Sequence, residues 1–277
     1  MEGEQRKLSS FKRSSGLYIS LFIRKWKSYF FLVSILILLG AAIYQAVSVG
    51  IDGSTMTVYK TPVDIYISWI GGGSRDNIAY WYYFLGPFIA LAYFVISFSW
   101  EREKGYLVQT GIRLDRKHTA LVRGIYVFIG SAAAFIVPEL INLAMIAVIR
   151  PALLPEPLVA IGPASDFIGA GLYYTHPLVY ILLYILFDGL AVGTMGLIGA
   201  VITLIADNGV VSMGILFGIY YLLFLVAGFT DNSDFSPAQF LIPGTGLGTV
   251  WPLILISVIA IVCILIIVYS GERHEDI

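Results

Sequence analysis

Residues 101–124 read EREKGYLVQTGIRLDRKHTALVRG, the one long charged run between hydrophobic segments of this chain. The run holds 6 of the 17 lysines and arginines, and the sequence after it is mostly apolar as far as Ser270. A charged run between two apolar segments of spanning length is typical of a loop on one side of a membrane. It is either a solvated loop whose charges set the topology or a docking element for a partner.

The composition is that of a membrane protein. Hydrophobic residues make up 58% of the 277 residues and charged residues only 13%, whereas soluble domains carry about 25% charged residues. The net charge of −1 gives no reason to expect nucleic acid as a partner. Cys263 is the single cysteine and the three histidines lie far apart in sequence, so neither a disulfide framework nor a metal site is predicted.

Six apolar runs are long enough to cross about 30 Å of hydrocarbon as helices. They cover roughly residues 29–50, 78–99, 120–149, 177–206, 209–228 and 250–270. We therefore expect an all-α membrane protein with six transmembrane helices in a single domain over residues 29–270. A short tail, residues 271–277, follows the last span. Aromatic residues at the span ends, such as Tyr80, Trp81, Tyr82 and Tyr83, are interpreted as an interfacial belt.

Residues 1–28 form a basic amino terminus with seven lysines and arginines. Several apolar side chains fall on one side of a helical wheel, namely Phe11, Tyr18, Ile19, Phe22 and Trp26. This pattern predicts an amphipathic helix lying at the membrane interface, with its basic side toward anionic lipid.

The distribution of basic residues predicts the orientation. With six spans both termini lie on one side of the membrane. The amino terminus, the 101–123 loop and the tail together hold fourteen basic residues, whereas the opposite loops hold only Lys60, Arg75 and Arg150. The positive-inside rule then places both termini in the cytoplasm. We expect a multi-pass protein of the cytoplasmic (plasma) membrane of a bacterium.

The predicted outer loops are residues 51–77, 150–176 and 229–249, and they are acidic. In the third of them Ser236 and Pro237 resemble an N-cap followed by a first-turn proline. They predict a short apolar helix over residues 237–242, on the outer side before the sixth span.

Two carboxylates are predicted within the membrane. Glu139 follows Pro138 and precedes Asn142 in the third span, and Asp188 lies in the fourth. At a rise of about 1.5 Å per residue, both lie at a similar depth. Intramembrane charges mark a functional hypothesis, so Glu139, Asn142 and Asp188 are candidates for a substrate or ion path and Pro138 for a hinge. The alternative is that the carboxyls are protonated, or hydrogen-bonded to Asn142 or a nearby backbone group, and tie helices together.

Nucleotide-binding and hydrolase motifs are lacking in the sequence. It contains no G-x-x-x-x-G-K-[ST], no H-E-x-x-H and no G-x-S-x-G. We predict no catalytic residues and no cofactor bound by this chain. An intramembrane enzyme would require Glu139 and Asp188 within reach of each other and of water.

The charged run also resembles a known family. Glu101-Arg102-Glu103-Lys104-Gly105, then Leu107, Val108 and a basic group ending in Arg123, resemble the loop between spans two and three of type-2 ABC exporter permeases. Two departures are Tyr106 in place of the usual threonine and the absence of a proline before the basic group. The resemblance implies that residues 101–119 are a coupling loop seated on an ATPase. It further implies two ABC ATPase subunits that bind ATP and Mg²⁺, and a second permease copy or paralogue.

The size of the chain bears on the expected substrate. A small chain without a large extracellular domain is similar to permeases for bacteriocins and other antimicrobial peptides, either exporting them or conferring immunity. An amphipathic peptide is therefore expected. The alternatives are a small-ion or drug exporter that uses Glu139 and Asp188, and a non-transporting membrane scaffold or sensor.

Overall fold

The computed structural model describes residues 28–52, 63–72, 77–103, 116–155, 163, 167–230, 232–244 and 247–273. Six long helices dominate them: α2 (Tyr29–Asp52), α4 (Asn77–Glu103), α6 (Arg116–Ile149), α8 (Pro177–Ala206), α9 (Gly209–Thr230) and α11 (Trp251–Arg273). All six have the length and apolar composition to cross a membrane. The chain is an all-α, six-span membrane protein, as predicted. The expected interfacial helix in residues 1–28 lies outside the described residues, apart from Ser28.

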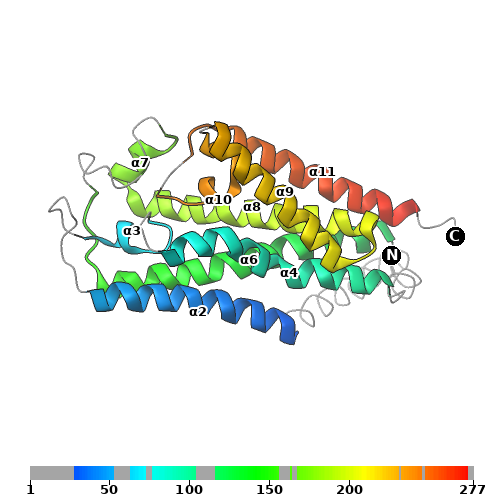
Figure 1. The fold of residues 1–277 in the computed structure, drawn as a ribbon, viewed down its shortest axis with the longest axis horizontal. Helices are drawn as coiled ribbons and strands as arrows, with labels where there is room; N and C mark the ends of the chain where they lie inside the picture. Colours follow the sequence, from blue (N-terminus) through cyan, green and yellow to red (C-terminus); the bar gives the residue numbers. More distant parts are fainter. Residues whose placement is uncertain are drawn as a thin grey trace, which may run out of the picture.

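The long helices run side by side as an antiparallel bundle (Figure 1). We call one end the basal end, where α2 begins, α4 ends, α6 begins and α11 ends. We call the other the capped end, because the short helices α3 (Ile65–Ser68) and α7 (Ala170–Thr175) lie there. The short helices η2 (Ser233–Phe235) and α10 (Pro237–Phe240) follow α9, and α10 lies alongside α8 within the bundle. This arrangement puts α2's first residue and α11's last on the same side of the bundle.

Helix α8 is the centre of the bundle. It packs against α6, α4, α11 and α9, and its contact with α6 depends on glycine. A Cβ at Gly193 would lie 2.9 Å from the backbone oxygen of Phe128, and one at Gly189 would overlap Ile136. Small residues of this kind allow two membrane helices to approach closely. The two glycines therefore set the spacing of α6 and α8.

The capped end is held by backbone and tyrosine hydrogen bonds. In α8 the hydroxyl of Tyr184 donates to the carbonyl of Phe240 at 2.6 Å, and that of Tyr180 donates to the carbonyl of Pro243 at 3.1 Å. The Gly244 N–H donates to the carbonyl of Gly71. Segments far apart in the sequence are thereby joined into one cap.

The helix predicted over residues 237–242 is confirmed as α10, which is shorter. Ser236 occupies the N-cap position and Pro237 the first turn, as predicted, although the Ser236 side chain makes no capping hydrogen bond. At α3 the cap is complete instead, because the N–H of Ile67 donates to Asp64 Oδ1 at 2.9 Å.

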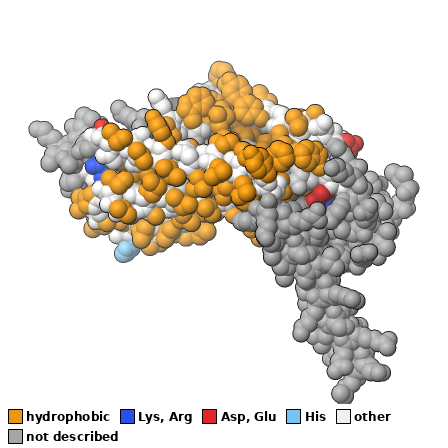
Figure 2. All heavy atoms as spheres, turned by 90° about the horizontal axis from the view of Figure 1, so that it is seen from below, with side chains coloured by type: hydrophobic (Ala, Val, Ile, Leu, Met, Phe, Trp, Pro, Cys, Tyr) orange, Lys and Arg blue, Asp and Glu red, His pale blue; other side chains and the backbone are white. Residues whose placement is uncertain are grey.

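The surface of the bundle is apolar between its ends. Figure 2 shows hydrophobic side chains over most of the described face, with visible charged groups near its two ends. Burial is uneven among the helices. Within the most apolar 18-residue stretch of each helix, 61% of the residues of α8 are buried, but only 17% of those of α11. Helices α2, α9 and α11 therefore present most of the surface available to lipid or to another protein.

Candidate functional site

Glu139 and Asp188 come together in the middle of the bundle. Gly189 faces Ile136 and Gly193 faces Phe128, so antiparallel α6 and α8 bring the two carboxyls to the same level. Both side chains are 0% exposed, and they are close enough to interact electrostatically. Each lies about 16–18 Å along its helix from the capped end. The sequence prediction that they share a depth agrees with this register.

The pair has no basic counter-ion from the spans. Apart from Arg102, Arg116, Lys117, Arg123 and Arg273 near the basal end, the six long helices contain no lysine or arginine. Within the described part of the chain, no group of three or more metal-ligating residues occurs either. Two ionised carboxylates would therefore lie at the same depth of an apolar interior, which is strongly unfavourable.

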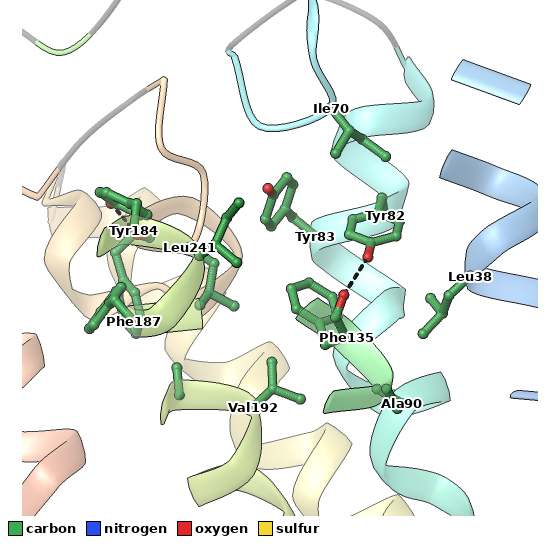
Figure 3. Close-up of a cluster of buried hydrophobic side chains, with 14 of the residues drawn as sticks. Leu38, Ile70, Tyr82, Tyr83, Ala90, Phe135, Tyr184, Phe187, Val192 and Leu241 are labelled. Carbon is green, nitrogen blue, oxygen red and sulfur yellow. Dashed lines mark hydrogen bonds between the residues drawn. The ribbon is translucent and has the colours of Figure 1, made fainter. Parts of the chain in front are cut away.

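Tyrosines of α4 line the same region. Tyr82 and Tyr83 are 3% and 0% exposed and point into the core (Figure 3). The Tyr82 hydroxyl donates to the carbonyl of Phe135 at 3.0 Å. The Tyr83 hydroxyl is within interaction range of Glu139, although no hydrogen bond of regular geometry joins them.

Interpreting these two tyrosines as belt residues was wrong, although Tyr80 and Trp81 beside them are exposed. The position of each residue around the helix is the signal that could have distinguished the buried Tyr82 and Tyr83 from the exposed Tyr80 and Trp81. Tyr83, Gly86 and Ala90 follow helical spacing on one side, and small residues there admit Phe135 of α6, whose ring would lie 3.0 Å from a Cβ at Gly86.

The cap closes directly over Tyr83. A Cβ at Gly71 would lie 2.7 Å from the Tyr83 hydroxyl and 2.5 Å from the Trp69 ring. Trp69 and Ile70 are completely buried, and Ile70 lies above Tyr82 and Tyr83 in Figure 3. The carboxyl pair is therefore separated from the capped end by a layer of packed protein.

Asn142 belongs to a different network from the carboxyl pair. Its Oδ1 accepts from the N–H of Ile70 at 2.8 Å, and its Nδ2 donates to the carbonyl of Ala42 at 2.8 Å and to Gln45 Oε1 at 2.7 Å. Gln45 in turn donates to the carbonyl of Ser68 at 3.0 Å. These bonds fasten the α3 segment to α2 and α6. Both polar atoms of the Asn142 amide are therefore hydrogen-bonded, and neither of these bonds is to Glu139.

The predicted hinge at Pro138 lies within an unbroken helix. Helix α6 continues through Pro138, as α4 continues through Pro87. Each proline removes the hydrogen bond to the carbonyl four residues earlier. For Pro87 that carbonyl belongs to Tyr83, and it accepts instead from the Tyr220 hydroxyl of α9 at 3.0 Å. Whether Pro138 bends during function stays a prediction.

At the basal end one ion pair joins the helices that flank the charged run. Glu101 near the end of α4 lies 3.6 Å from Arg123 of α6, with side chains 19% and 12% exposed. The backbone of Arg102 and Glu103 completes α4, whereas Lys104, Gly105, Leu107 and Val108 lie outside the described residues. The ion pair therefore ties the end of α4 to the beginning of α6, on the two sides of the charged run.

Comparison with protein-family models, with curated proteins and with solved structures finds no match to this chain.

Proposed function

We propose that the chain is the membrane subunit of an ATP-driven exporter, energised by a separate ATPase that docks on the charged run. The observation that carries the proposal is the helical hairpin of α4 and α6. Its basal ends are joined by Glu101 and Arg123, and the same helices carry Tyr83 and Glu139 in the core. A displacement of the charged loop would thus be passed along both helices to the middle of the membrane.

The charged residues at the base of the hairpin include acidic ones. A docking element would use these, whereas membrane topology alone does not require them. Positive-inside bias explains lysines and arginines, but it does not explain the acidic residues Glu101 and Glu103 in the last turn of α4. Glu101 also has a role within the chain, as the ion-pair partner of Arg123. Acidic and basic groups beyond the lipid offer charged contacts to a partner. In this proposal the basal end faces the cytoplasm and the capped end faces outward.

A second permease copy would have an open helix face to pack on. A Cβ at Gly214 or Gly218 of α9 meets nothing within 4 Å, in contrast to Gly193 in the core. The surrounding surface is apolar, with Ile215 and Leu222 among its exposed side chains. The G-x-x-x-G spacing of α9 is therefore available for a helix of another chain.

The substrate that best fits the proposal is an amphipathic peptide. Its path would run along the bundle and leave at the capped end, where the acidic loops would favour a cationic molecule. A small-ion or drug exporter is the second candidate, because a buried carboxyl pair is itself a feature of ion pathways. In that case Glu139→Gln and Asp188→Asn, made separately, would each abolish transport, whereas a peptide path would be only mildly affected.

The test is purification of this chain with the ATPase encoded beside it. We expect a stable complex whose ATP hydrolysis rises when an amphipathic cationic peptide is added. Glu101→Arg should uncouple hydrolysis from the peptide, and the exchange Glu101→Arg with Arg123→Glu should restore part of the coupling. Absence of an adjacent P-loop ATPase, or failure of any such ATPase to bind, would favour a non-transporting scaffold or sensor.

A further inference from the structure

We propose that Glu139 and Asp188 form a proton-binding site in the middle of the bundle, in which the buried carboxyls hold exchangeable protons. The inference concerns this chain alone and does not depend on an ATPase partner. It is carried by the position of the two side chains, the absence of a basic counter-ion in the spans, and the lack of hydrogen-bond partners that would fix a structural acid.

The carboxyl pair lacks compensating charge within the long helices. Both carboxyls are fully buried, and the lysines and arginines of the long helices lie near the basal end. Two negative charges at the same depth of an apolar interior repel each other and lose their hydration. A positive charge must therefore be supplied from outside the helices, and a proton is the smallest form in which it can arrive.

The surroundings of the pair do not supply the ligands of a metal cation. Gly189, next to Asp188, already has the side chains of Ile136 and Ala132 against it. Hard metal cations take about six or more oxygen ligands, whereas the pair offers two carboxyls and the nearby Tyr83 hydroxyl. No further metal-ligating side chain completes the set among the described residues. A proton requires no such shell.

The carboxyl oxygens also lack fixed partners among the described residues. None of the four carboxyl oxygens makes a hydrogen bond of regular geometry to a described residue. A purely structural acid is normally anchored by such bonds, since buried polar groups in folded proteins are nearly always paired. Asn142, the obvious neighbour, is committed to Ile70, Ala42 and Gln45. The Tyr83 hydroxyl is the polar group that remains next to Glu139.

The other titratable groups around the pair are tyrosines. Tyr82 and Tyr83 interact with it from α4, and Tyr180 and Tyr184 interact with Asp188 from α8. Tyr82, Tyr180 and Tyr184 donate their hydroxyl protons to backbone carbonyls. The described parts of α2 and α11 bring no charged side chain to this depth.

Tyr83 is placed between the pair and the cap. Its hydroxyl approaches Glu139 on one side and the backbone of Gly71 on the other. Displacement of the segment containing Trp69 and Gly71 would let water reach this hydroxyl, and a carboxyl proton would then pass to solvent. The carboxyl O–H bond breaks, a hydronium ion forms, and the pair is left with one more negative charge.

The proposal is tested by infrared titration of the full chain in lipid nanodiscs. At neutral pH we expect the C=O stretch of a protonated, buried carboxyl, shifted on exchange into D₂O and lost reversibly in alkaline buffer. The double variant Glu139→Gln with Asp188→Asn should lack this titrating band. Its amide side chains imitate the protonated acids, so the double variant should fold. Its thermal stability should fall less with rising pH than that of the wild type.

Three results would overturn the proposal. The band could be absent at every pH, which would mean an ionised pair neutralised by another cation. It could persist unchanged into alkaline buffer, which would mean a fixed structural acid. It could disappear at constant pH when choline is replaced by sodium or potassium, which would mean a metal-cation site. If the double variant does not fold, Glu139→Gln alone carries the comparison, because it removes one of the two titrating carboxyls.

Discussion

The hydroxyl of Tyr220 donates a 3.0 Å hydrogen bond to the backbone carbonyl of Tyr83, the carbonyl that Pro87 deprives of its helical partner. Tyr220 lies on α9 and Tyr83 on α4, so the proline of one helix is compensated by the side chain of another. Both residues are buried, at 2% and 0% exposure. This bond joins α9, whose surface is largely open, to the helix that also faces the carboxyl pair.

Tyr220→Phe should destabilise the protein by about 1 kcal/mol, because a buried carbonyl then lacks a partner while the ring is retained. Thermal unfolding in detergent or nanodiscs measures the loss. Tyr221→Phe is the matched control: Tyr221 is 44% exposed and should tolerate the change. Equal stability of the two variants would show that the bond to Tyr83 contributes nothing.

The glycines of α8 and α9 should respond in opposite ways to alanine. Gly193→Ala places a methyl group 2.9 Å from the backbone oxygen of Phe128, and overpacking of this kind costs about 1–3 kcal/mol. Gly218→Ala meets nothing within 4 Å and removes the helix penalty of glycine, a gain of up to about 1 kcal/mol. Chemical or thermal unfolding of the two variants under the same conditions compares them. A stable Gly193→Ala protein would mean that α6 and α8 can separate freely.

Much of this fold was predictable because membrane helices are long apolar runs. The boundaries of α8 at Pro177 and Ala206 agree with the predicted span, since a proline begins it and Asp207, at φ 51°, ends it. The turn that follows is completed by Asn208, whose Oδ1 accepts from the N–H of Val210 at 2.9 Å. Local signals of this kind can be read from a single sequence.

Long-range partners were not predictable in the same way. Nothing near Asn142 in sequence indicates that its amide binds Ile70, 72 residues away, and Glu139 only three residues earlier made a more obvious partner. The burial of Tyr83 likewise depends on where α6 and the cap segment lie. The functional roles of Glu101 to Val108, Pro138, Glu139, Asn142 and Asp188 stay predictions, because geometry places only some of these side chains and tests none of the roles.

Asp64 should give the capped end a measurable pH dependence. Burial raises the pKa of its carboxyl above the ordinary value, and the hydrogen bonds from the backbone of Ile67 and Tyr66 only partly oppose this. Folding therefore favours the protonated acid. Its contribution is present at acidic pH and is lost as the pH rises from the unfolded value of about 3.9 through the higher folded value.

Asp64→Asn should remove this dependence while keeping an oxygen that accepts from Ile67. The measurement is the difference in unfolding temperature between wild type and variant across that pH range, in which other titrations largely cancel. We expect the variant to gain relative to wild type as the pH rises. Asp64→Ala, which also loses the cap, should be less stable than Asp64→Asn by about 1 kcal/mol. A difference that does not change with pH would contradict the prediction.

Asn142→Leu should release the α3 segment from the bundle. The substitution leaves the buried N–H of Ile70 and the Oε1 of Gln45 without their partner, and each orphaned group costs about 1–3 kcal/mol. Hydrogen exchange followed by mass spectrometry should show faster exchange in the peptide covering residues 65–72. Peptides from the interior of α8 should be unchanged.

Gln45→Leu is the companion variant, since it removes the bond to Asn142 and the bond to the carbonyl of Ser68. The double variant should cost less than the sum of the two single ones, because both remove the same contact between the two amides. If instead the costs add and exchange at residues 65–72 stays slow, the segment is held by the packing of Trp69 and Ile70 rather than by the amide network. Asn142 would then have no need of its three hydrogen bonds for holding the cap, and its proximity to Glu139 would again become the better explanation of its place in the membrane.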